Sequence, residues 1–364
     1  MVDQKPLDSK SEHDFSIELE KLKYRKVRAK SALFILLSAV LLFVIAGISL
    51  ALGSANMTFF DAYTAVLARF FPDTFHVTPL ADTVVWTLRL PRIILAILAG
   101  AILALGGCTT MATLKNPIAT PYTLGVSAGA GFGAAIAIIL NTGLIAGPFM
   151  IIGNAFVFSL IPVAVILLLV KRKGASPVTM ILGGVAMAYF FTACTTILQY
   201  FAADDAVKGT VFWAVGDLSN AAWNILPYIL GVFFIAFAVN LWISWDLNAM
   251  RMGDDTAKSL GVNVDRTRKI ALIIACLSTA TVIAFTGAIG FICLVAPHIC
   301  KAVVGQDQRL LVISSGLVGA ILLLVADIVA RRLIDGNILP VGAITAFLGA
   351  PLLFYLLLKM QKSN

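Results

Sequence analysis

The sequence predicts an all-α, polytopic membrane protein with about ten transmembrane helices per subunit. Of its 364 residues, 60% are hydrophobic and 13% are charged, about half the charged share of a soluble domain. The hydrophobic residues come in long runs that approach the length needed to span hydrocarbon. Basic residues cluster beside those runs, as loops on the cytoplasmic side of a membrane do. Together these observations favour membrane spans over one large soluble core.

The apolar runs, taken in chain order, place a tail and then ten spans. Residues 1–30 mix charges of both signs, so we expect a cytoplasmic N-terminal tail, partly helical and unlike a signal peptide. The transmembrane permease domain then covers 31–364. Its spans are expected near 32–53, 93–113, 123–140, 146–170, 178–203, 224–245, 269–286, 288–304, 310–330 and 341–358. Two of them meet almost without a loop between Gly287 and Gly290.

The distribution of Lys and Arg sets the orientation. With ten spans and the N-terminus inside, 21 of the 27 Lys and Arg residues fall in cytoplasmic segments and six fall outside. This bias predicts a multi-pass protein of the cytoplasmic (inner) membrane with both termini in the cytoplasm. The net charge of +8 is explained by this placement next to membrane lipid, so we expect no nucleic-acid partner.

The first outer loop, about 54–88, is expected to carry a short helix. Thr58 followed by Asp61 matches a capping box at a helix start. Aromatic residues in the same loop, such as Phe59 and Phe70, favour the membrane surface. Within the spans, small residues such as Gly100 favour close packing of helices.

Several sequence patterns that carry chemistry are missing. There is no G-x-x-x-x-G-K-[ST] loop to cradle ATP phosphates and no H-E-x-x-H zinc motif. The three His residues are far apart, and all five Cys lie inside apolar runs without a CxxC pair. These cysteines are typical of packing residues rather than of disulfides or metal ligands. We therefore expect a subunit that is not an enzyme and holds no metal or cofactor of its own.

Asp327 is the clearest ionisable residue inside a span, and an intramembrane acid is a functional hypothesis by default. Arg331 lies one helical turn further on, so the two are expected to form a local ion pair. His298 follows Pro297 near the cytoplasmic end of its span. Because no second ligand is near it in the sequence, we expect a structural role for His298.

Polar residues recur at helical spacing in the 178–203 span. Thr192, Thr195, Thr196 and Gln199 fall on one helical face. They fit either a polar pathway between subunits or hydrogen bonds between helices, and the residues alone favour neither.

The segment of about 247–267 interrupts the apolar pattern on the expected cytoplasmic side. Gly253 and Gly261 bound a short stretch, and Gly261 is suited to end a helix with a positive φ. Taken alone, the segment is more typical of an ordinary solvated loop than of a docking element.

Four ordered stretches resemble the FecCD-type permease family of ABC importers, which serves iron-siderophores, haem and cobalamin. The first is RLPR at 89–92, and the second is KNPIATP at 115–121 with LGV at 124–126. The third combines LNA at 247–249, GDD at 253–255 and LGV at 260–262. The fourth runs from GAIGFI at 287–292 through LVAPH at 294–298, ADIVAR at 326–331 and LPVG at 339–342 to GAP at 349–351. The match covers roughly 85–364.

The resemblance implies a fold and an assembly. The fold would be that of a type II ABC importer permease, similar to the cobalamin permease. A second permease subunit, identical or different, would enclose a pathway along the shared interface, bordered by the span that contains Thr192. Two cytoplasmic ABC ATPase subunits would use ATP and Mg, and an extracytoplasmic solute-binding protein would deliver the metal chelate.

The resemblance also implies two contact sites. The 247–267 segment would be the element that couples to the ATPase, through Leu247, Asn248, Ala249, Gly253, Asp254, Asp255, Ala257, Leu260 and Gly261. Arginines matching Arg89, Arg92 and Arg331 would receive acidic residues of the binding protein, because the planar guanidinium holds a carboxylate through two hydrogen bonds. Snorkelling of long basic side chains at span ends is the alternative account of these arginines.

Three positions depart from the family pattern. Met111 stands where Gln is usual, Gln308 where His is usual, and Ile338 where an acidic residue often precedes the Leu-Pro pair. Any outer-surface contact made by that acid is therefore in question for this chain.

These observations predict a permease subunit of an ATP-binding-cassette importer for a metal chelate, with an iron-siderophore as the first expectation from the family. Haem or cobalamin import stays open within the same family. From another class, an ion-coupled secondary transporter also stays open, although such carriers usually have more buried carboxylates. An integral membrane enzyme finds no support in the residues.

Overall fold

The computed structural model describes residues 9–52, 58–75, 77–174, 176–334 and 339–361. These residues form helices joined by short loops, without a β-strand among them. In chain order the helices are α1 (Ser9–Ala51), α2 (Phe59–Ala68), α3 (Pro79–Thr83), the π-helix η1 (Val84–Arg89), α4 (Leu90–Leu114), the 3-10 turn η2 (Tyr122–Leu124), α5 (Val126–Leu140), α6 (Met150–Lys173), α7 (Pro177–Tyr200), α8 (Asp204–Val215), α9 (Leu226–Arg251), α10 (Asp254–Ser259), α11 (Val264–Thr286), α12 (Ile292–Val304), α13 (Gln308–Arg332) and α14 (Val341–Gln361).

The ten expected spans correspond to ten apolar helices: α1, α4, α5, α6, α7, α9, α11, α12, α13 and α14. Seven helical stretches among the described residues are long and apolar enough to cross a membrane, and α5, α12 and α14 are shorter apolar helices. The all-α, polytopic fold class is therefore confirmed. The capping box at Thr58 and Asp61 is also confirmed, because Thr58 accepts from the Asp61 amide and Asp61 accepts from the Thr58 amide at the start of α2.

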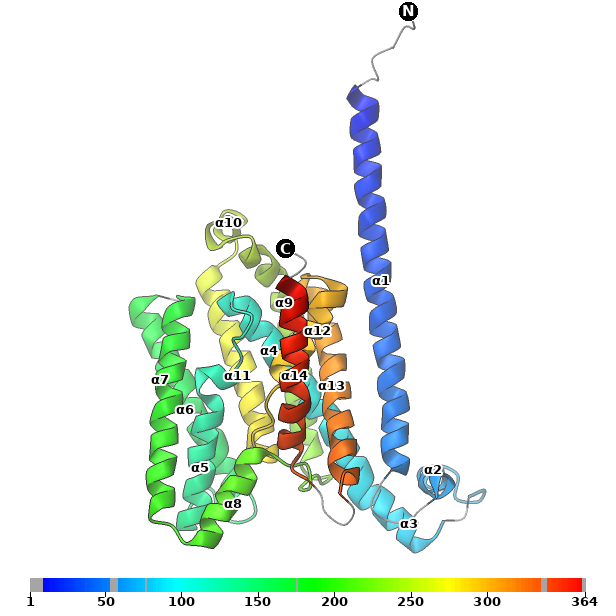
Figure 1. Ribbon diagram of the computed structural model, residues 1–364, viewed down its shortest axis with the longest axis vertical. Helices are drawn as coiled ribbons and strands as arrows, with labels where there is room; N and C mark the ends of the chain where they lie inside the picture. Colours follow the sequence, from blue (N-terminus) through cyan, green and yellow to red (C-terminus); the bar gives the residue numbers. More distant parts are fainter. Residues whose placement is uncertain (1–8, 53–57, 76, 175, 335–338, 362–364) are drawn as a thin grey trace, which may run out of the picture.

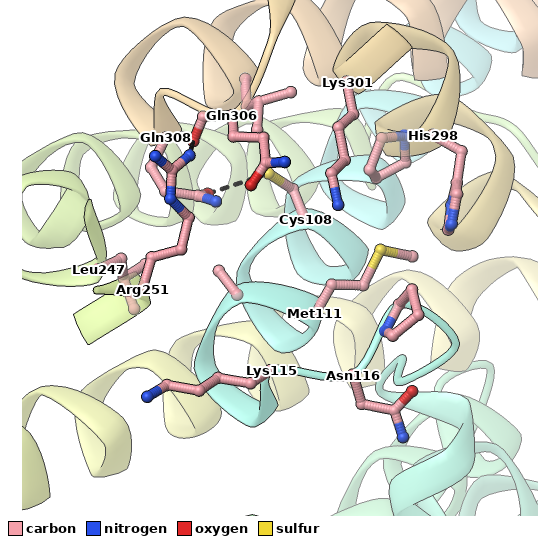
Figure 2. A pocket seen from close by; sticks show the side chains of 14 residues that line it. Cys108, Met111, Lys115, Asn116, Leu247, Arg251, His298, Lys301, Gln306 and Gln308 are labelled. Atoms are coloured by element: carbon pink, nitrogen blue, oxygen red, sulfur yellow. Dashed lines mark hydrogen bonds between the residues drawn. The ribbon is translucent and has the colours of Figure 1, made fainter. Parts of the chain in front are cut away.

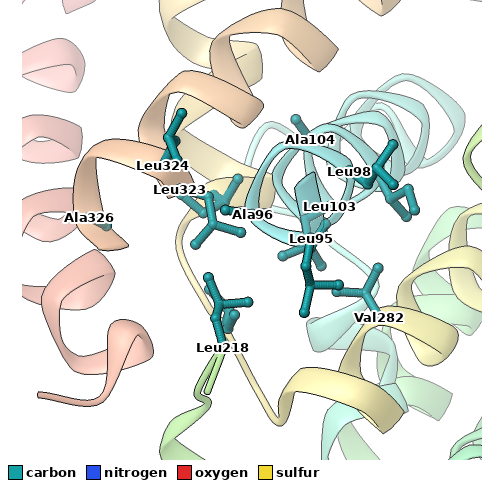
Figure 3. Packing of buried hydrophobic residues seen from close by; sticks show 14 of the residues in the cluster. Leu95, Ala96, Leu98, Leu103, Ala104, Leu218, Val282, Leu323, Leu324 and Ala326 are labelled. Atoms are coloured by element: carbon teal, nitrogen blue, oxygen red, sulfur yellow. The ribbon is translucent and has the colours of Figure 1, made fainter. Parts of the chain in front are cut away.

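Helix α4 is the centre of the bundle, with α13, α11, α9 and α12 packed around it (Figure 1). Most of its length is buried. Figure 3 shows Leu95 and Leu103 of α4 among Val282 of α11 and Leu323 of α13. Gly100 lets α4 approach α13 closely, since a Cβ at Gly100 would overlap the backbone of Gly319. The close packing expected of Gly100 is thereby confirmed.

Helix α1 lies at the edge of the bundle and is the longest helix. It has 43 residues, or about 65 Å at 1.5 Å per residue, about twice the hydrocarbon thickness of a bilayer. The segment of α1 that is apolar enough to span a membrane is Arg28–Ala51. The expected boundary at residue 30 thus falls inside a continuous helix, where the composition changes and the secondary structure does not. The cytoplasmic placement of residues 1–30 stays a prediction.

The bundle has two ends that differ in the elements they carry. The start of α1, the end of α14 and α10 lie at one end, here called the α10 end (Figure 1). The helices α2, α3 and α8 lie at the opposite end, here called the α8 end. Both termini of the described chain therefore point to the side on which the coupling segment lies.

Two local features differ from the expected spans. Helix α11 ends at Gly287, which has φ 69°, and α12 begins only after Phe291, which has φ 67°. Two positive φ values turn the chain sharply, so the span expected from 288 begins four residues later, at Ile292. Helix α8 was not expected, because its acidic first turn, with Asp204 and Asp205, interrupts the apolar pattern.

The π-helix η1 joins α3 to α4 and leaves one carbonyl without a partner inside the helix. The amide of Leu90 donates to Val85, five residues back. The next amide in that series would be that of Pro91, which has no N–H, so the Trp86 carbonyl is free to accept from outside. The indole of Trp223 donates to it at 2.7 Å, which connects the loop after α8 to η1.

Candidate functional site

The expected coupling segment is a short helix held against the bundle by apolar side chains. After α9 ends at Arg251, the chain turns at Gly253 and forms α10. Leu247 of α9, Ala257 of α10 and Val264 of α11 are buried together in one apolar cluster. Gly261 has φ 84°, as the sequence predicted, and a Cβ there would meet nothing within 4 Å. The segment is therefore a folded element whose position is fixed by α9 and α11.

Asp254, at the start of α10, ties the coupling segment to two other helices. Lys115 Nζ lies 2.7 Å from Asp254 Oδ1, and Arg268 Nη2 lies 3.0 Å from Asp254 Oδ2. Lys115 is the C-cap of α4 and has a left-handed backbone, which directs the chain into the loop that follows. Arg268 is buried near the start of α11. Burial alone would raise the pKa of Asp254, but hydrogen bonds from Lys115 and Arg268 outweigh it and hold that pKa below its usual value.

A second polar network fixes α9 to the start of α13. Asn248 Nδ2 donates to Asp307 Oδ1 at 2.8 Å, and the backbone N–H of Gln308 donates to Asn248 Oδ1 at 2.9 Å. Arg309 Nη2 lies 2.7 Å from Asp307 Oδ2. Burial raises the pKa of Asp307, yet the bonds from Arg309 and Asn248 leave it lower than usual. The half-buried Asn248 therefore links α9 to the start of α13.

The outward surface of the coupling segment is small and mixed in character. Among the nine residues that the resemblance placed in the coupling element, Asp255, Leu260 and Gly261 are exposed, whereas Leu247 and Ala257 are buried. Met252 is exposed next to them. An exposed Leu and Met beside charged residues can contact a soluble partner. The buried residues of the nine therefore anchor the segment, and the exposed ones are available for contact. The contact role stays a prediction.

The three arginines expected at the binding-protein surface are engaged within the chain: Arg89 and Arg92 are buried, and only 8% of the Arg331 side chain is exposed. Asp327 is fully buried and accepts from Arg92 Nε at 2.7 Å and from Arg331 Nε at 2.9 Å. The ion pair expected between Asp327 and Arg331 is thus confirmed. Arg92 also donates to Ser219 at 2.9 Å and lies 3.7 Å from Asp217, so this arginine connects α4 to α13 and to the loop after α8.

The same arginines hold the end of α1. Arg89 Nη1 donates to the carbonyl of Leu50 at 2.7 Å. Arg331 donates to the carbonyl of Leu52 at 2.8 Å and to the Ser49 hydroxyl at 2.7 Å. These bonds satisfy carbonyls at the C-terminus of α1 and place positive charge there, where the helix dipole favours it. This geometry favours a structural role for the three arginines, and binding-protein docking stays a prediction. Ile338 lies outside the described residues.

The polar face of α7 is exposed at Thr192 and Thr196 and half-buried at Thr195 and Gln199. The hydroxyls of Thr192, Thr195 and Thr196 donate to carbonyls of α7 itself. Gln199 reaches α8, where its amide donates to Thr210 at 2.8 Å. Helix α7 packs on α5, α6 and the η2 turn on one side, and its exposed residues on the other side face lipid or another subunit. A pathway role for these residues stays a prediction.

A pocket of about 340 Å³ lies at the α10 end between α4, α9, α12 and the start of α13 (Figure 2). Met111 and Gln308, two of the departures from the family pattern, both line it. Cys108 and Gln308 are in contact there at 3.5 Å. His298 also lines the pocket, and its Nδ1 bonds to the carbonyl of Leu294 at 2.7 Å. No group of three or more His, Cys, Asp or Glu that could hold a metal is found among the described residues.

The comparisons with known proteins agree with this fold and identify its class. The model of the FecCD transport family matches residues 39–359. A protein of Methanocaldococcus jannaschii named as an ABC transporter permease is 42% identical, over 93% of this chain and 98% of the relative. The cobalamin import permease BtuC of Halobacterium salinarum is 37% identical, over 81% of this chain and 77% of the relative. The Fe(3+)-citrate import permease YfmE of Bacillus subtilis is 32% identical, over 92% and 97%.

A solved structure carries the same fold. It is an ABC transporter assigned to the metal-chelate type, in an inward-facing conformation, with a TM-score of 0.78 and 28% identity over 89% of this chain and 98% of that one. The chain is therefore the integral membrane permease of an ABC importer. It belongs to the FecCD transport family.

Proposed function

We propose that the chain is the permease subunit of an importer that carries a metal chelate, most specifically an iron-siderophore, across the cytoplasmic membrane. The likeness to a solved ABC transporter of the metal-chelate type supports the substrate class. The relatives named for Fe(3+)-citrate and for cobalamin also carry a metal that is already coordinated. Such cargo needs polar and apolar contacts in the pathway and no metal ligands from the permease. Haem and cobalamin are the alternatives within the same class.

The proposal orients the chain with its α10 end in the cytoplasm. The positive-inside bias of the sequence supports this orientation, and the start of α1, the end of α14 and α10 lie together at that end (Figure 1). One of the two ATPase subunits would dock on the exposed surface of α10 of this chain, where Leu260 and Met252 offer apolar contact. Energy for transport would then come from ATP and Mg on those partners.

A second permease subunit, identical or different, would pack beside α7. The exposed hydroxyl-bearing residues Thr192 and Thr196 support an interface there, because polar side chains in spans favour contact with another helix over contact with lipid. The face with Thr192 and Thr196 would border the pathway between the two subunits. Threonines whose hydroxyls bond within their own helix leave an oxygen lone pair for a polar cargo.

Reconstitution tests this function directly. Proteoliposomes containing the permease, its ATPase and its binding protein are given labelled ferric siderophore, haem and cyanocobalamin in parallel. We expect concentrative uptake of the ferric siderophore that requires ATP, and none by the permease alone. Preferred uptake of haem or cobalamin would overturn the iron-siderophore assignment. Uptake driven by a proton or sodium gradient without ATPase would overturn the importer mechanism and favour a secondary transporter.

Docking of the binding protein at Arg89, Arg92 and Arg331 needs a variant that keeps the chain folded. Reversal of Arg331 to Glu places a second carboxylate beside the buried Asp327, so it tests folding before docking. Replacement of Arg331 by Lys keeps the charge and removes the planar guanidinium. If the arginine receives an acidic residue of the binding protein, capture by R331K weakens and becomes more sensitive to salt. Capture equal to that of the wild type at every salt concentration would leave Arg331 with its structural role alone.

A further inference from the structure

We propose that the pocket at the α10 end binds a phosphate-type oxyanion. The pocket is separate from the α7 face, and neither the family nor the proposed cargo assigns a ligand to it. The proposal rests on the charge of the lining, on the pairing of the acids nearby and on the size of the space.

Three cations from three helices line the pocket: Lys115 of α4, Arg251 of α9 and Lys301 of α12. None of its fourteen lining residues, all of them in the described part of the chain, is Asp or Glu. In Figure 2 the amino group of Lys301 points into the space between Met111 and Gln308. A pocket with low-dielectric walls and charges of one sign concentrates counter-ions, so this lining selects for an anion.

The acids near the pocket are already neutralised by other residues. Asp254 is shared between Lys115 and Arg268, and Asp307 is paired with Arg309. Arg251 donates to the carbonyl of Gln306 at 2.8 Å, which leaves its charge uncompensated. For Lys301 the described residues provide neither an ion pair nor a hydrogen bond. Arg251 and Lys301 are therefore the two cations that an anion would bridge.

Neutral donors complete the site. Gln308 is buried, and Asn116 and Gln306 also line the pocket, so amide groups lie beside the two cations. A phosphate group has several acceptor oxygens, and amide and guanidinium N–H groups are suited to bind them. The pocket has a volume of about 340 Å³, well above the roughly 10–15 Å³ that admits one water. It holds a phosphate and part of the group to which the phosphate is attached, whereas one carboxylate would leave much of it empty.

Two sources present this chemistry at the α10 end: a free phosphate and the phosphate of a phospholipid headgroup. Basic pockets between helices at a membrane surface bind anionic headgroups. In either case the ligand would connect Arg251, at the base of the coupling segment, to α12. A bound anion would therefore restrict movement of the end of α9, from which α10 extends, relative to α12.

The test uses the full-length permease in phosphatidylcholine nanodiscs, with labelled inorganic phosphate and chloride to hold the ionic strength constant. We expect saturable binding of one phosphate per chain. Replacement of Lys301 or Arg251 by Gln should weaken this binding by at least about tenfold, and K301R should retain most of it. The matched control is K258Q, because Lys258 is exposed on α10, pairs with Asp255 and does not line the pocket; it should bind as the wild type does.

A second arm separates the two sources. In nanodiscs that contain phosphatidylglycerol, native mass spectrometry counts retained lipid on the wild type and on K301Q. If the wild type retains lipid that K301Q loses, and added phosphate no longer binds to the wild type, the site binds a lipid headgroup. Phosphate binding that is unchanged by phosphatidylglycerol assigns it to a free oxyanion. If neither ligand binds in a manner that depends on Lys301 and Arg251, the pocket is not an anion site.

Discussion

At one end of the bundle Asp327 lies between Arg92 and Arg331, and at the α10 end Asp254 lies between Lys115 and Arg268. In both clusters one carboxylate is shared by two cations from different helices, and Arg92 also lies 3.7 Å from the more exposed Asp217. They differ in burial, because Asp327 is fully buried, whereas about a third of the Asp254 side chain is exposed. The same chemistry therefore works under two different solvation conditions in one chain.

The difference in burial indicates that the Asp327 cluster is a permanent contact between helices and that the Asp254 cluster can open. A buried carboxylate that loses one partner leaves an uncompensated charge, so the Asp327 cluster holds α4, α13 and the end of α1 together. An exposed carboxylate can exchange a protein partner for water at low cost. The Asp254 cluster is therefore suited to an element that has to move with a partner, and the Asp327 cluster to one that has to stay in place.

Replacement of Asp327 by Asn should have the largest effect. It removes the carboxylate that Arg92 and Arg331 share and leaves Arg92 with only the more distant Asp217 at 3.7 Å among the described carboxylates, which costs about 3–5 kcal/mol. Thermal unfolding of the purified permease in detergent measures the loss. The control is D205N, since Asp205 is almost fully exposed in its pair with Lys208, and we expect it to unfold with the wild type. Equal midpoints for D327N and the wild type would show that the buried cluster is no stronger than the exposed one.

Replacement of Gly261 by Val should have a smaller effect that is confined to the coupling segment. The φ of 84° is unfavourable for a β-branched residue, at a cost of about 1–3 kcal/mol. We expect normal membrane insertion, and stimulation of the partner ATPase reduced by roughly tenfold, since 1.4 kcal/mol corresponds to that factor.

The matched control for this prediction is G231V. Gly231 lies inside α9, and a Cβ there would meet nothing within 4 Å. G231V should therefore assemble and couple as the wild type does. Normal ATPase stimulation by G261V would contradict either the coupling role of the segment or the strain at this residue.

Replacement of Asp254 by Asn should cost less stability than D327N, because about a third of the Asp254 side chain is exposed and water can take part in replacing the lost contacts, although the buried Arg268 loses a carboxylate partner. It should still impair coupling, since it releases α10 from α4 and α11. The measurement combines a thermal midpoint with ATPase stimulation in proteoliposomes. A loss of stability as large as that of D327N would remove the proposed difference between the two clusters.

The smallest expected effect is a dependence of stability on pH. Asp254 and Asp307 have pKa values held below the usual one. Their contribution is therefore complete above the unfolded pKa of about 3.9 and is lost as the pH falls through their folded values. The thermal midpoint of the wild type should decrease as the pH is lowered below about 4. The midpoint of D254N should decrease less steeply over the same pH range. Parallel curves for the two proteins would show that Asp254 does not carry this dependence.

The spans and the coupling segment were predictable from the sequence because each is a local pattern. Long apolar runs define α1, α4, α9 and α13, and a Gly after a short polar helix defines the stop at Gly261. The pairing of Asp327 with Arg331 was likewise local, at one helical turn. Hydrophobic periodicity and charge counting predict such features, because each feature depends on residues that are close together in the sequence.

The features that were missed depend on contacts between distant parts of the chain. Nothing near Arg92 in the sequence indicates that Asp327 is its partner, or that Asp254 is shared by Lys115 and Arg268. The arginines were expected at the surface because they end spans, and the structure buries them because the end of α1 covers them. Only the packing of α1 against α13 decides between these two outcomes.

The missing N–H of Pro91 has a consequence for how this chain can evolve. Since Pro91 leaves the Trp86 carbonyl open, the indole of Trp223 acquires a hydrogen bond that a regular helix would not offer. Replacing Pro91 by Ala would supply a competing N–H inside the helix, and the indole would then have to find another acceptor. The two positions should therefore change together among descendants of this gene: lineages that lose the proline are freed from keeping a tryptophan at the distant site.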